Sequence, residues 1–217
     1  MVLDDVINSP HFSLNDTIRK NFREKAIEYA SCGEFSPETF KKDATAQARN
    51  IRQTTSALFG IYDRSKVLLE PSFVCEMLGV QGRVDMMTSD RRMLVEQKSG
   101  RNRYIELGRQ NGSGGKYLEK HYVQLLLYYG VLKYNFGLDG QDIEVMLLYS
   151  KYPMPEGLIR TRHLEAELRE AIAFRNRVVA QELAMTRDGF ASAIDRLTPE
   201  TLNVNGMSGF FYDRYLL

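Results

Sequence analysis

The sequence predicts an α/β protein whose core runs helix, strand, strand, strand, helix, strand, with further helices at both ends. Three observations predict it. Apolar residues recur at helical spacing before residue 60, three short apolar segments separated by turn residues follow, and a strong helix then precedes a nearly all-apolar strand. The chain has 217 residues, 43% of them hydrophobic. That length suits one domain, so we predict a single domain with a core at 36–150 and helical additions at 1–35 and 151–217.

Two helices are expected before the strands. In residues 15–30, apolar side chains recur at the spacing of one helical face. A second helix is predicted to start at Ser36, because Pro37 then occupies the first helical position, which proline favours. It runs to about Phe59 and carries many polar residues, which indicates a broad solvated face.

Three strands and a loop are expected next. The strands are short apolar segments bounded by turn residues, at Val67–Val74, Gly82–Thr88 and Met93–Gln97. Residues 101–116 contain a run of asparagine, glycine and serine, which predicts a flexible loop.

The second half of the core is a helix followed by a strand. The helix is predicted over Lys116–Phe136 and is closed by Gly137. Ile143–Tyr149 is nearly all apolar, as expected of a strand buried on both faces. A further amphipathic helix is predicted from His163 to about Arg187.

Composition excludes several classes of protein. The net charge is +1, so a polyanionic partner would have to be attracted by local charge. Cys32 and Cys75 are too few for a disulfide framework, a four-cysteine zinc site or an iron–sulfur cluster. The first fifteen residues lack the apolar segment of a signal peptide, and the longest apolar stretch, Val123–Leu132, is too short to cross a bilayer. We therefore expect an intracellular, cytoplasmic protein.

The second and third strands bring three charged residues together. A hairpin centred on the turn at 89–92 places Asp85 directly opposite Glu96, so that both side chains share one face of the sheet. Lys98, two residues beyond Glu96, points to the same face, and Gln97 points to the other. A turn longer or shorter by one residue would separate the two carboxylates onto opposite faces.

This combination suits the cleavage of phosphodiesters. A divalent cation polarises the phosphoryl oxygen and lowers the pKa of an attacking water, and Mg²⁺ accepts one or two carboxylates besides waters and phosphate. Asp85 and Glu96 are the expected ligands, and Lys98 would orient the water or neutralise charge on the phosphate. A third acid would come from the preceding strand region, where Glu70 ranks ahead of Glu76.

An ordinary surface hairpin with one cross-strand salt bridge would carry the same residues. Asp, Glu and Lys are common on surfaces, so spacing alone does not separate the two interpretations. The apolar neighbours Val84, Met86 and Val95 favour a buried strand pair, in which charges are costly unless they are paired or bound to metal.

A set of motifs in the right order carries a resemblance to a known family. It consists of Gly82-Arg83-Val84-Asp85, then Glu96-Gln97-Lys98, and then Gln124 with Tyr128. This set resembles the PD-(D/E)XK nuclease superfamily, and most of all the branch of RecB-type nucleases, CRISPR adaptation nucleases and helicase-associated nucleases. The resemblance covers about residues 36–150. It implies a restriction-endonuclease-like αβββαβ core with a mixed central sheet.

The resemblance also implies roles for individual residues in a Mg²⁺- or Mn²⁺-dependent nuclease. Asp85 and Glu96 match the metal-binding carboxylates, and Lys98 matches the catalytic lysine. Gln97 would give its main-chain carbonyl to the metal. Downstream, a Q-x-x-x-Y motif that lies beside the active site and DNA is matched by Gln124 and Tyr128.

The sequence departs from the family in two respects. Members with an iron–sulfur cluster need four cysteines, so we predict no cluster here. Many members also carry a metal-binding histidine on the early helix, and residues 36–59 contain none. That ligand is therefore absent or replaced by an acid such as Glu70.

The helix from residue 116 supplies a stripe of polar and aromatic groups. Tyr117, His121, Gln124 and Tyr128 follow one another at spacings of four, three and four residues, which places them on one face. Such a stripe suggests the wall of a site, in which His121 contacts DNA or makes a structural hydrogen bond rather than binding metal. Taken without the motif, the spacing favours tyrosines at the edge of the core with their hydroxyls in water.

Positive charge gathers near the expected site. Between residues 91 and 120, basic residues exceed acidic ones by five. Arg101 and Arg103 would hold phosphates while the glycines of their loop let it close over a strand. We expect the partner to be DNA, single-stranded or at ends, with a helicase region in the same parent chain or on a partner. The alternatives are a non-catalytic nucleic-acid-binding module and an α/β scaffold for protein contacts.

Overall fold

The computed structural model describes residues 6–8, 13–31, 33, 35–112, 114–138, 143–162 and 165–194. The chain divides into two compact units, residues 1–168 and residues 169–217. Every strand found among the described residues belongs to the first unit. Over the part of the chain described, no helix is both long and apolar enough to cross a membrane.

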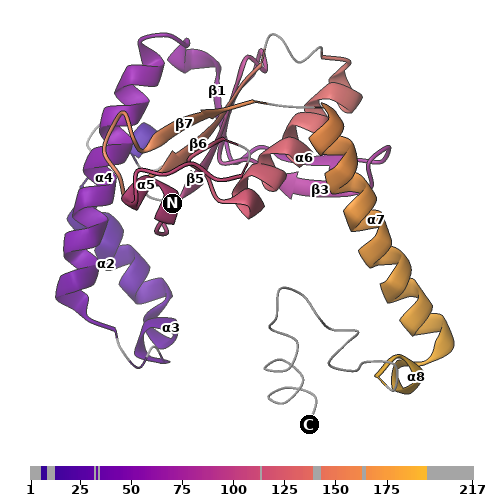
Figure 1. The fold of residues 1–217 in the computed structure, drawn as a ribbon. Helices are drawn as coiled ribbons and strands as arrows, with labels where there is room; N and C mark the ends of the chain where they lie inside the picture. Colours follow the sequence, from indigo (N-terminus) through magenta and orange to yellow (C-terminus); the bar gives the residue numbers. More distant parts are fainter. Residues whose placement is uncertain are drawn as a thin grey trace. The chain divides into compact units, whose positions relative to one another are not determined.

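A mixed five-stranded sheet forms the centre of the first unit (Figure 1). Its spatial order is β1-β4-β5-β6-β7. These strands are β1 Val67–Leu69, β4 Met86–Thr88, β5 Met93–Lys98, β6 Glu144–Tyr149 and β7 Leu158–Thr161. Only β5 and β6 pair in parallel, and the other neighbours are antiparallel. The α/β class and the mixed sheet predicted from the sequence are therefore confirmed.

Two of the predicted strands are in fact each broken in two. Val67–Val74 divides into β1 and β2 (Ser72–Cys75), and Gly82–Thr88 divides into β3 (Val80–Arg83) and β4. The first break occurs where Glu70 adopts a φ of 51° and Pro71 lacks an N–H to donate to a ladder. As a result, β2 and β3 form a separate antiparallel pair. The ring of Phe73 in β2 lies edge-on to Tyr128 at 5.2 Å between ring centroids.

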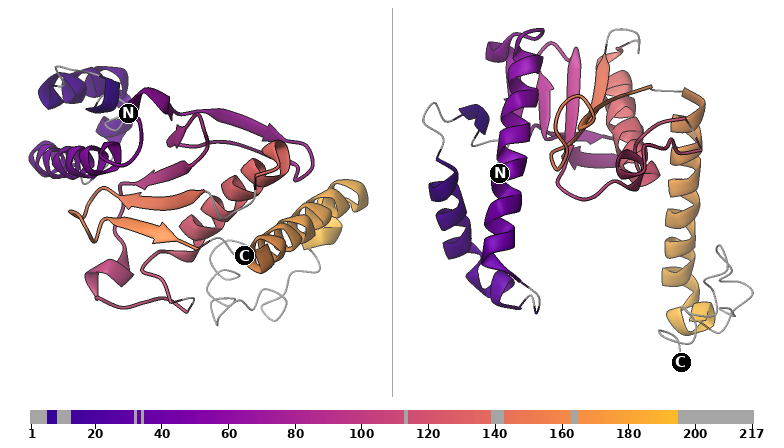
Figure 2. Two further views of the ribbon diagram at one scale, coloured as in Figure 1. Left: turned by 90° about the horizontal axis from the view of Figure 1, so that it is seen from above. Right: turned by 60° about the vertical axis from the view of Figure 1, so that its left-hand side comes forward.

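Helices cover both faces of the central sheet (Figure 2). On one face lies α4, Pro37–Phe59, whose predicted bounds are confirmed. Its N-cap Ser36 accepts a hydrogen bond from the N–H of Thr39, which satisfies one of the unpaired donors of the first turn. The core on this face contains Ile51 and Leu58 of α4 with Met86, Met93, Val95, Met146 and Leu148 of the sheet.

The other face is covered by α6, Glu119–Phe136, which begins three residues after the predicted start. Gly137 closes it in the left-handed region with a φ of 62°, as the sequence predicts. The helix buries Leu125 and Leu126 among its apolar residues. Cys75 of β2 is a buried free thiol, and Cys32 lies outside the described residues.

The predicted N-terminal helix is broken into α2, Leu14–Glu24, and α3, Ala26–Ser31. Its aromatic residues do not face the sheet. They pack on one another and on the residues around the start of α4, with ring centroids 4.8–5.6 Å apart among Phe22, Tyr29, Phe35 and Phe40. This addition therefore has a small aromatic core of its own.

The segment predicted as a flexible loop is held by two buried asparagines, and it contains a short helix, α5, Arg103–Glu106. Asn102 donates to the carbonyl of Lys116 at 2.8 Å. Asn111 donates to the carbonyl of Tyr117 at 2.9 Å. Side-chain bonds of this kind hold the backbone where a ladder is missing.

The remaining elements are short or lie towards the end of the chain. A 3₁₀ turn, η1 at Arg64–Lys66, leads into β1, and β7 was not predicted. α7 spans Glu165–Asp188 and passes from the first unit into the second, followed by α8 at Phe190–Ile194. The predicted start of α7 at His163 lies outside the described residues.

Candidate functional site

The hairpin of β4 and β5 has the register that the sequence predicts. Met86 pairs with Val95 and Met87 with Leu94, so continuing the ladder by one residue sets Asp85 opposite Glu96. Asp85 is half-buried, and its Oδ2 accepts the main-chain N–H of Gln97 at 2.6 Å. This hydrogen bond fixes the carboxylate against the strand that carries the other two charged residues.

Glu96 and Lys98 point together towards α6. Glu96 is only 4% exposed, although it is ionisable. The Nζ of Lys98 lies 2.8 Å from Oε1 of Glu96. Both side chains also bond to Gln124 of α6, which confirms that they share one face of the sheet. A buried carboxylate needs such partners, because burying an unpaired charge is costly.

Gln124 and Tyr128 connect this pair to the small second sheet. Lys98 donates to Oε1 of Gln124 at 2.7 Å, and Nε2 of Gln124 donates to Glu96 at 2.8 Å and to the Tyr128 hydroxyl at 2.7 Å. Tyr128 in turn donates to the carbonyl of Arg83 at 3.1 Å. The Q-x-x-x-Y motif therefore holds the carboxylate and the lysine in place.

One oxygen of Glu96 has no such partner. This oxygen, Oε2, is buried and accepts no hydrogen bond of ordinary geometry from the described residues, although the main-chain N–H of Asp85 is near enough to the carboxylate to lower its pKa. Burial raises the pKa of the carboxyl group, the hydrogen bond from Lys98 lowers it, and the charge of Asp85 raises it. A divalent cation coordinated by this oxygen would satisfy the atom and offset the repulsion between the two carboxylates, so the residues present fit a metal ion.

The third acidic ligand expected at Glu70 is not part of this group. Its carboxylate forms an exposed ion pair with Arg83 at 3.0 Å. Its main-chain N–H, however, donates to the carbonyl of Asp85 at 3.0 Å, so the backbone of Glu70 lies beside the site. Within the described ranges, no three His, Cys, Asp or Glu side chains gather as a metal-binding set.

The side chain and the main chain of Gln97 bond to different neighbours. Its side chain points away from Glu96 and donates to the Ser150 hydroxyl at 3.1 Å, as predicted from the alternation of strand side chains. Its main-chain N–H points to Asp85. Because the N–H and C=O of one strand residue face the same edge, the carbonyl of Gln97 also faces the side of Asp85.

His121 makes a structural hydrogen bond, one of the two roles expected for it. Its Nδ1 lies 2.9 Å from the hydroxyl of Tyr149, which also accepts the N–H of Leu118 at 3.1 Å. Burial, together with the charges of Lys98 and Lys120, lowers the pKa of His121 to about 4. The imidazole is therefore neutral near pH 7. Burial also raises the pKa of Tyr149 to about 12.

Tyr117 does not belong to the predicted stripe. It precedes α6, because the helix starts only at Glu119, and its ring stacks on Tyr122 at 4.6 Å between centroids. Helical spacing does not apply to a residue outside the helix. The stripe is reduced to His121, Gln124 and Tyr128.

Arg101 and Arg103 lie just beyond the end of β5. They line a shallow, open pocket with Lys120 and Glu119 at the start of α6. Arg101 forms an ion pair with Glu106 at 2.9 Å, and the guanidinium of Arg103 lies over the ring of Tyr104 at 4.8 Å. Both side chains are exposed, so they can reach a ligand that approaches the carboxyl end of β5.

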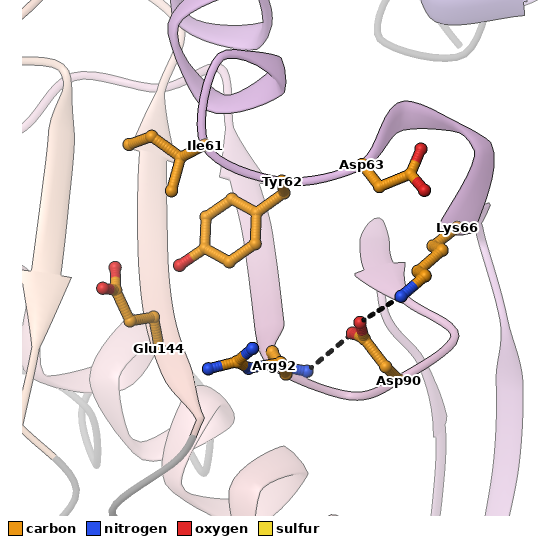
Figure 3. Close-up of a pocket in the computed structure, with 7 residues that line it drawn as sticks. All are labelled: Ile61, Tyr62, Asp63, Lys66, Asp90, Arg92 and Glu144. Atoms are coloured by element: carbon orange, nitrogen blue, oxygen red, sulfur yellow. Dashed lines mark hydrogen bonds and ion pairs between the residues drawn. The ribbon is translucent and has the colours of Figure 1, made fainter.

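A different pocket lies at the opposite end of the hairpin (Figure 3). Its walls carry both signs of charge, with Lys66 bonded to Asp90 at 3.3 Å. Arg92 and Glu144 come from the starts of β5 and β6, whereas Lys98 ends β5, so this pocket is separate from the Asp85 group. Its acids are partly neutralised by its own cations.

Sequence reasoning missed two residues of the site region. Tyr149 is the last residue of β6 and Ser150 follows it; both are completely buried, and Tyr149 is the register partner of Lys98. Nothing in their local sequence sets them apart from an ordinary strand end. Only the parallel pairing of β5 with β6 brings them beside the lysine.

Comparison of the chain with protein-family models, with curated proteins and with solved structures found no match. The site is therefore interpreted from its own geometry.

Proposed function

We propose that this chain is a metal-dependent deoxyribonuclease that uses Mg²⁺ or Mn²⁺. The observation that carries the proposal is the convergence of Asp85, Glu96 and Lys98 at one end of a sheet, with a buried oxygen of Glu96 that accepts no hydrogen bond of ordinary geometry from the described residues. A buried acceptor without a partner costs free energy, so a partner that bonds to this oxygen would stabilise the group. A hard cation supplies what that oxygen lacks.

The residues that would hold the cation are Asp85, Oε2 of Glu96 and the carbonyl of Gln97. When bound, the cation would polarise the phosphoryl oxygen and lower the pKa of the attacking water. Glu70 is 42% exposed at its side chain and would need to leave Arg83 before joining them. Two carboxylates with waters and a phosphate oxygen satisfy the preference of Mg²⁺ without it.

Lys98 would act on the substrate rather than on the metal. Its ammonium group lies between Glu96 and Gln124, 19% exposed at the side chain, so it faces the position where a phosphate beside the carboxylates would lie. There it neutralises negative charge that develops during cleavage. Arg101 and Arg103 would bind neighbouring phosphates of the same strand, since both are exposed next to the end of β5.

The proposal extends to the fold and to the context of the enzyme. Counting β1 with β2, and β3 with β4, as two bent strands, the elements from α4 to β6 follow the αβββαβ order of a restriction-endonuclease-like core. The substrate class that this site suits is single-stranded DNA or DNA ends, in association with a helicase in repair or recombination. A DNA-binding module that does not cut is the rival function.

The test is cleavage of labelled single- and double-stranded DNA in Mn²⁺ and in EDTA. We expect metal-dependent products from the natural sequence, and a loss of at least about 100-fold in Asp85→Ala and in Lys98→Ala, because the groups act as one unit. Asp90→Ala and Lys66→Ala are matched controls. They remove the same residue types from the ion pair at the other end of the hairpin.

The outcomes separate the functions. Equal activity in all four variants would show that the products come from a contaminant, which would overturn the proposal. DNA that is retarded in a gel but never cut, in Mg²⁺ or Mn²⁺, would indicate the binding module instead.

A further inference from the structure

A network of polar side chains connects α4 to β5 on the face of the sheet opposite the proposed site. The hydroxyl of Ser150 accepts from Nε2 of Gln97 at 3.1 Å and donates to Oε1 of Gln47 at 2.6 Å. The carbonyl of Lys98 lies farther from the hydroxyl, at 3.3 Å, so the single hydroxyl proton goes to Gln47. Asn50, also on α4, donates to the carbonyl of Ser150 at 3.0 Å.

The residues Ser150 and Asn50 of this network are buried. Ser150 is 0% exposed and Asn50 is 3% exposed. Buried polar groups in the interior are costly unless satisfied, and here each one that is named has a partner on a different element. The network therefore specifies how α4, β5 and the end of β6 fit together.

The Ser150 network also contacts the strand that carries the site. Gln97 lies between Glu96 and Lys98, and its main chain bonds to Asp85 through its N–H. The main-chain N–H of Ser150 donates to the carbonyl of Lys98 at 3.0 Å. Ser150 thus holds the side chain of Gln97 and the main chain of Lys98 at the same time.

We infer that Ser150 is a positioning residue for the metal site, and that Gln47 fixes its hydroxyl. The inference rests on the proposed function. By anchoring Gln97 from behind, the hydroxyl sets the direction of the carbonyl that would face the cation and the angle at which Glu96 and Lys98 leave the strand. Groups that orient metal ligands without touching the metal commonly change metal affinity by about 10- to 100-fold when removed.

The experiment measures Mn²⁺ binding directly, by the loss of the electron paramagnetic resonance signal of free Mn²⁺, beside DNA cleavage. In Ser150→Ala we expect about tenfold weaker Mn²⁺ binding and a matching rise in the Mn²⁺ concentration for half-maximal cleavage. At saturating Mn²⁺ the KM for DNA should be unchanged, because the network lies on the face away from Arg101 and Arg103.

Further variants separate positioning from folding. Gln47→Leu removes the acceptor at a partly exposed position and should weaken Mn²⁺ binding in the same direction, whereas Gln47→Glu keeps an acceptor and should restore it. Thr88→Ala is the matched control, since its buried hydroxyl accepts the N–H groups of Arg92 and Met93 at the far end of the hairpin. Folding is checked by circular dichroism and thermal unfolding. If Ser150→Ala does not fold, the two Gln47 variants decide.

Each result has one meaning. Mn²⁺ binding within about twofold of the natural sequence in Ser150→Ala and Gln47→Leu would overturn the inference and leave the nuclease standing. An equal loss in Thr88→Ala would also overturn it, because the effect would then be one of stability. A natural chain that binds no Mn²⁺ and cuts no DNA would overturn the proposed function, and the inference with it.

Discussion

Glu96 of β5 is buried and His121 of α6 is half-buried, and burial shifts the pKa values of these two side chains in opposite directions. Burial raises the pKa of Glu96 and lowers the pKa of His121, because it disfavours the charged form of each. Lys98 acts on both groups. It forms an ion pair with Glu96, and its positive charge adds to the lowering of the pKa of His121. A carboxylate beside an ammonium and a neutral imidazole is a local charge pattern that suits binding of a cation and a phosphate together.

The histidine gives a test at the scale of one residue. In the unfolded chain His121 takes up a proton near its ordinary pKa of 6.5, and in the folded chain only near 4. Between these values the unfolded state binds more protons, so His121 reduces stability as the pH falls from 6.5 to 4 and adds nothing further below that. In His121→Asn we expect a smaller loss of stability than in the natural sequence between pH 7 and pH 4.5.

The measurement is urea unfolding of both proteins at the two pH values. The raised pKa of Glu96 acts in the opposite direction, stabilising the folded state as the pH falls through its own window. The difference between the two proteins therefore isolates the histidine. Parallel losses in both would show that His121 takes up its proton near its ordinary pKa in the folded state as well.

At the scale of elements, hydrogen bonds and a glycine define the turn that leads into β5 and the two ends of α6. In the turn of the β4–β5 hairpin, at the end away from the site, the hydroxyl of Thr88 accepts the main-chain N–H groups of Arg92 and Met93. α6 has no side-chain cap at its start, where the hydroxyl of Tyr149 accepts the N–H of Leu118 instead. At its other end Gly137 adopts a φ of 62°.

This glycine gives a prediction for the helix. Nothing lies within 4 Å of a Cβ added at Gly137, so Gly137→Ala tests backbone conformation alone. We expect a loss of about 1 kcal/mol in the free energy of unfolding, because an alanine is strained in the left-handed region. Gly112→Ala is the control, since it also has open space around it and no left-handed φ. A loss of equal size in both variants would contradict this explanation.

At the scale of the whole molecule, the chain divides within α7. The first turn of α7 belongs to the first unit, where Leu168 is 1% exposed and Glu165 forms an ion pair with Lys133 at 2.6 Å. Beyond it, large apolar side chains of α7 and α8 are exposed, among them Phe174, Leu183 and Phe190. The first unit thus contains the site and its own core.

A shortened chain tests this division. Ending the protein after Asn176 keeps about three turns of α7, including the contacts of its first turn, and removes most of the exposed apolar residues. We expect a single cooperative unfolding transition and retention of Mn²⁺-dependent cleavage, with less aggregation. Circular dichroism, thermal unfolding and the cleavage assay are the measurements. Loss of the cooperative transition would show that the second unit is needed for the first to fold.

Much of this architecture could be predicted from the sequence because it is governed by local rules. Ser36 and Pro37 determine the start of α4, and Gly137 determines the end of α6. The even-numbered turn between Thr88 and Met93 and the alternation of strand side chains put Asp85, Glu96 and Lys98 on one face. The nuclease function expected from these motifs stays a prediction until the cleavage assay is done.

The rest was decided by contacts between residues distant in the sequence. The network of Ser150 joins it to Gln97 and to Gln47, which are 53 and 103 residues away, so no short window contains these partners. The sequence by itself determined which side chains of the β4–β5 hairpin share a face, since the alternation of strand side chains is a local property of the backbone. The tertiary structure alone decided which of their atoms are satisfied, because hydrogen-bond partners and burial follow from how the elements pack.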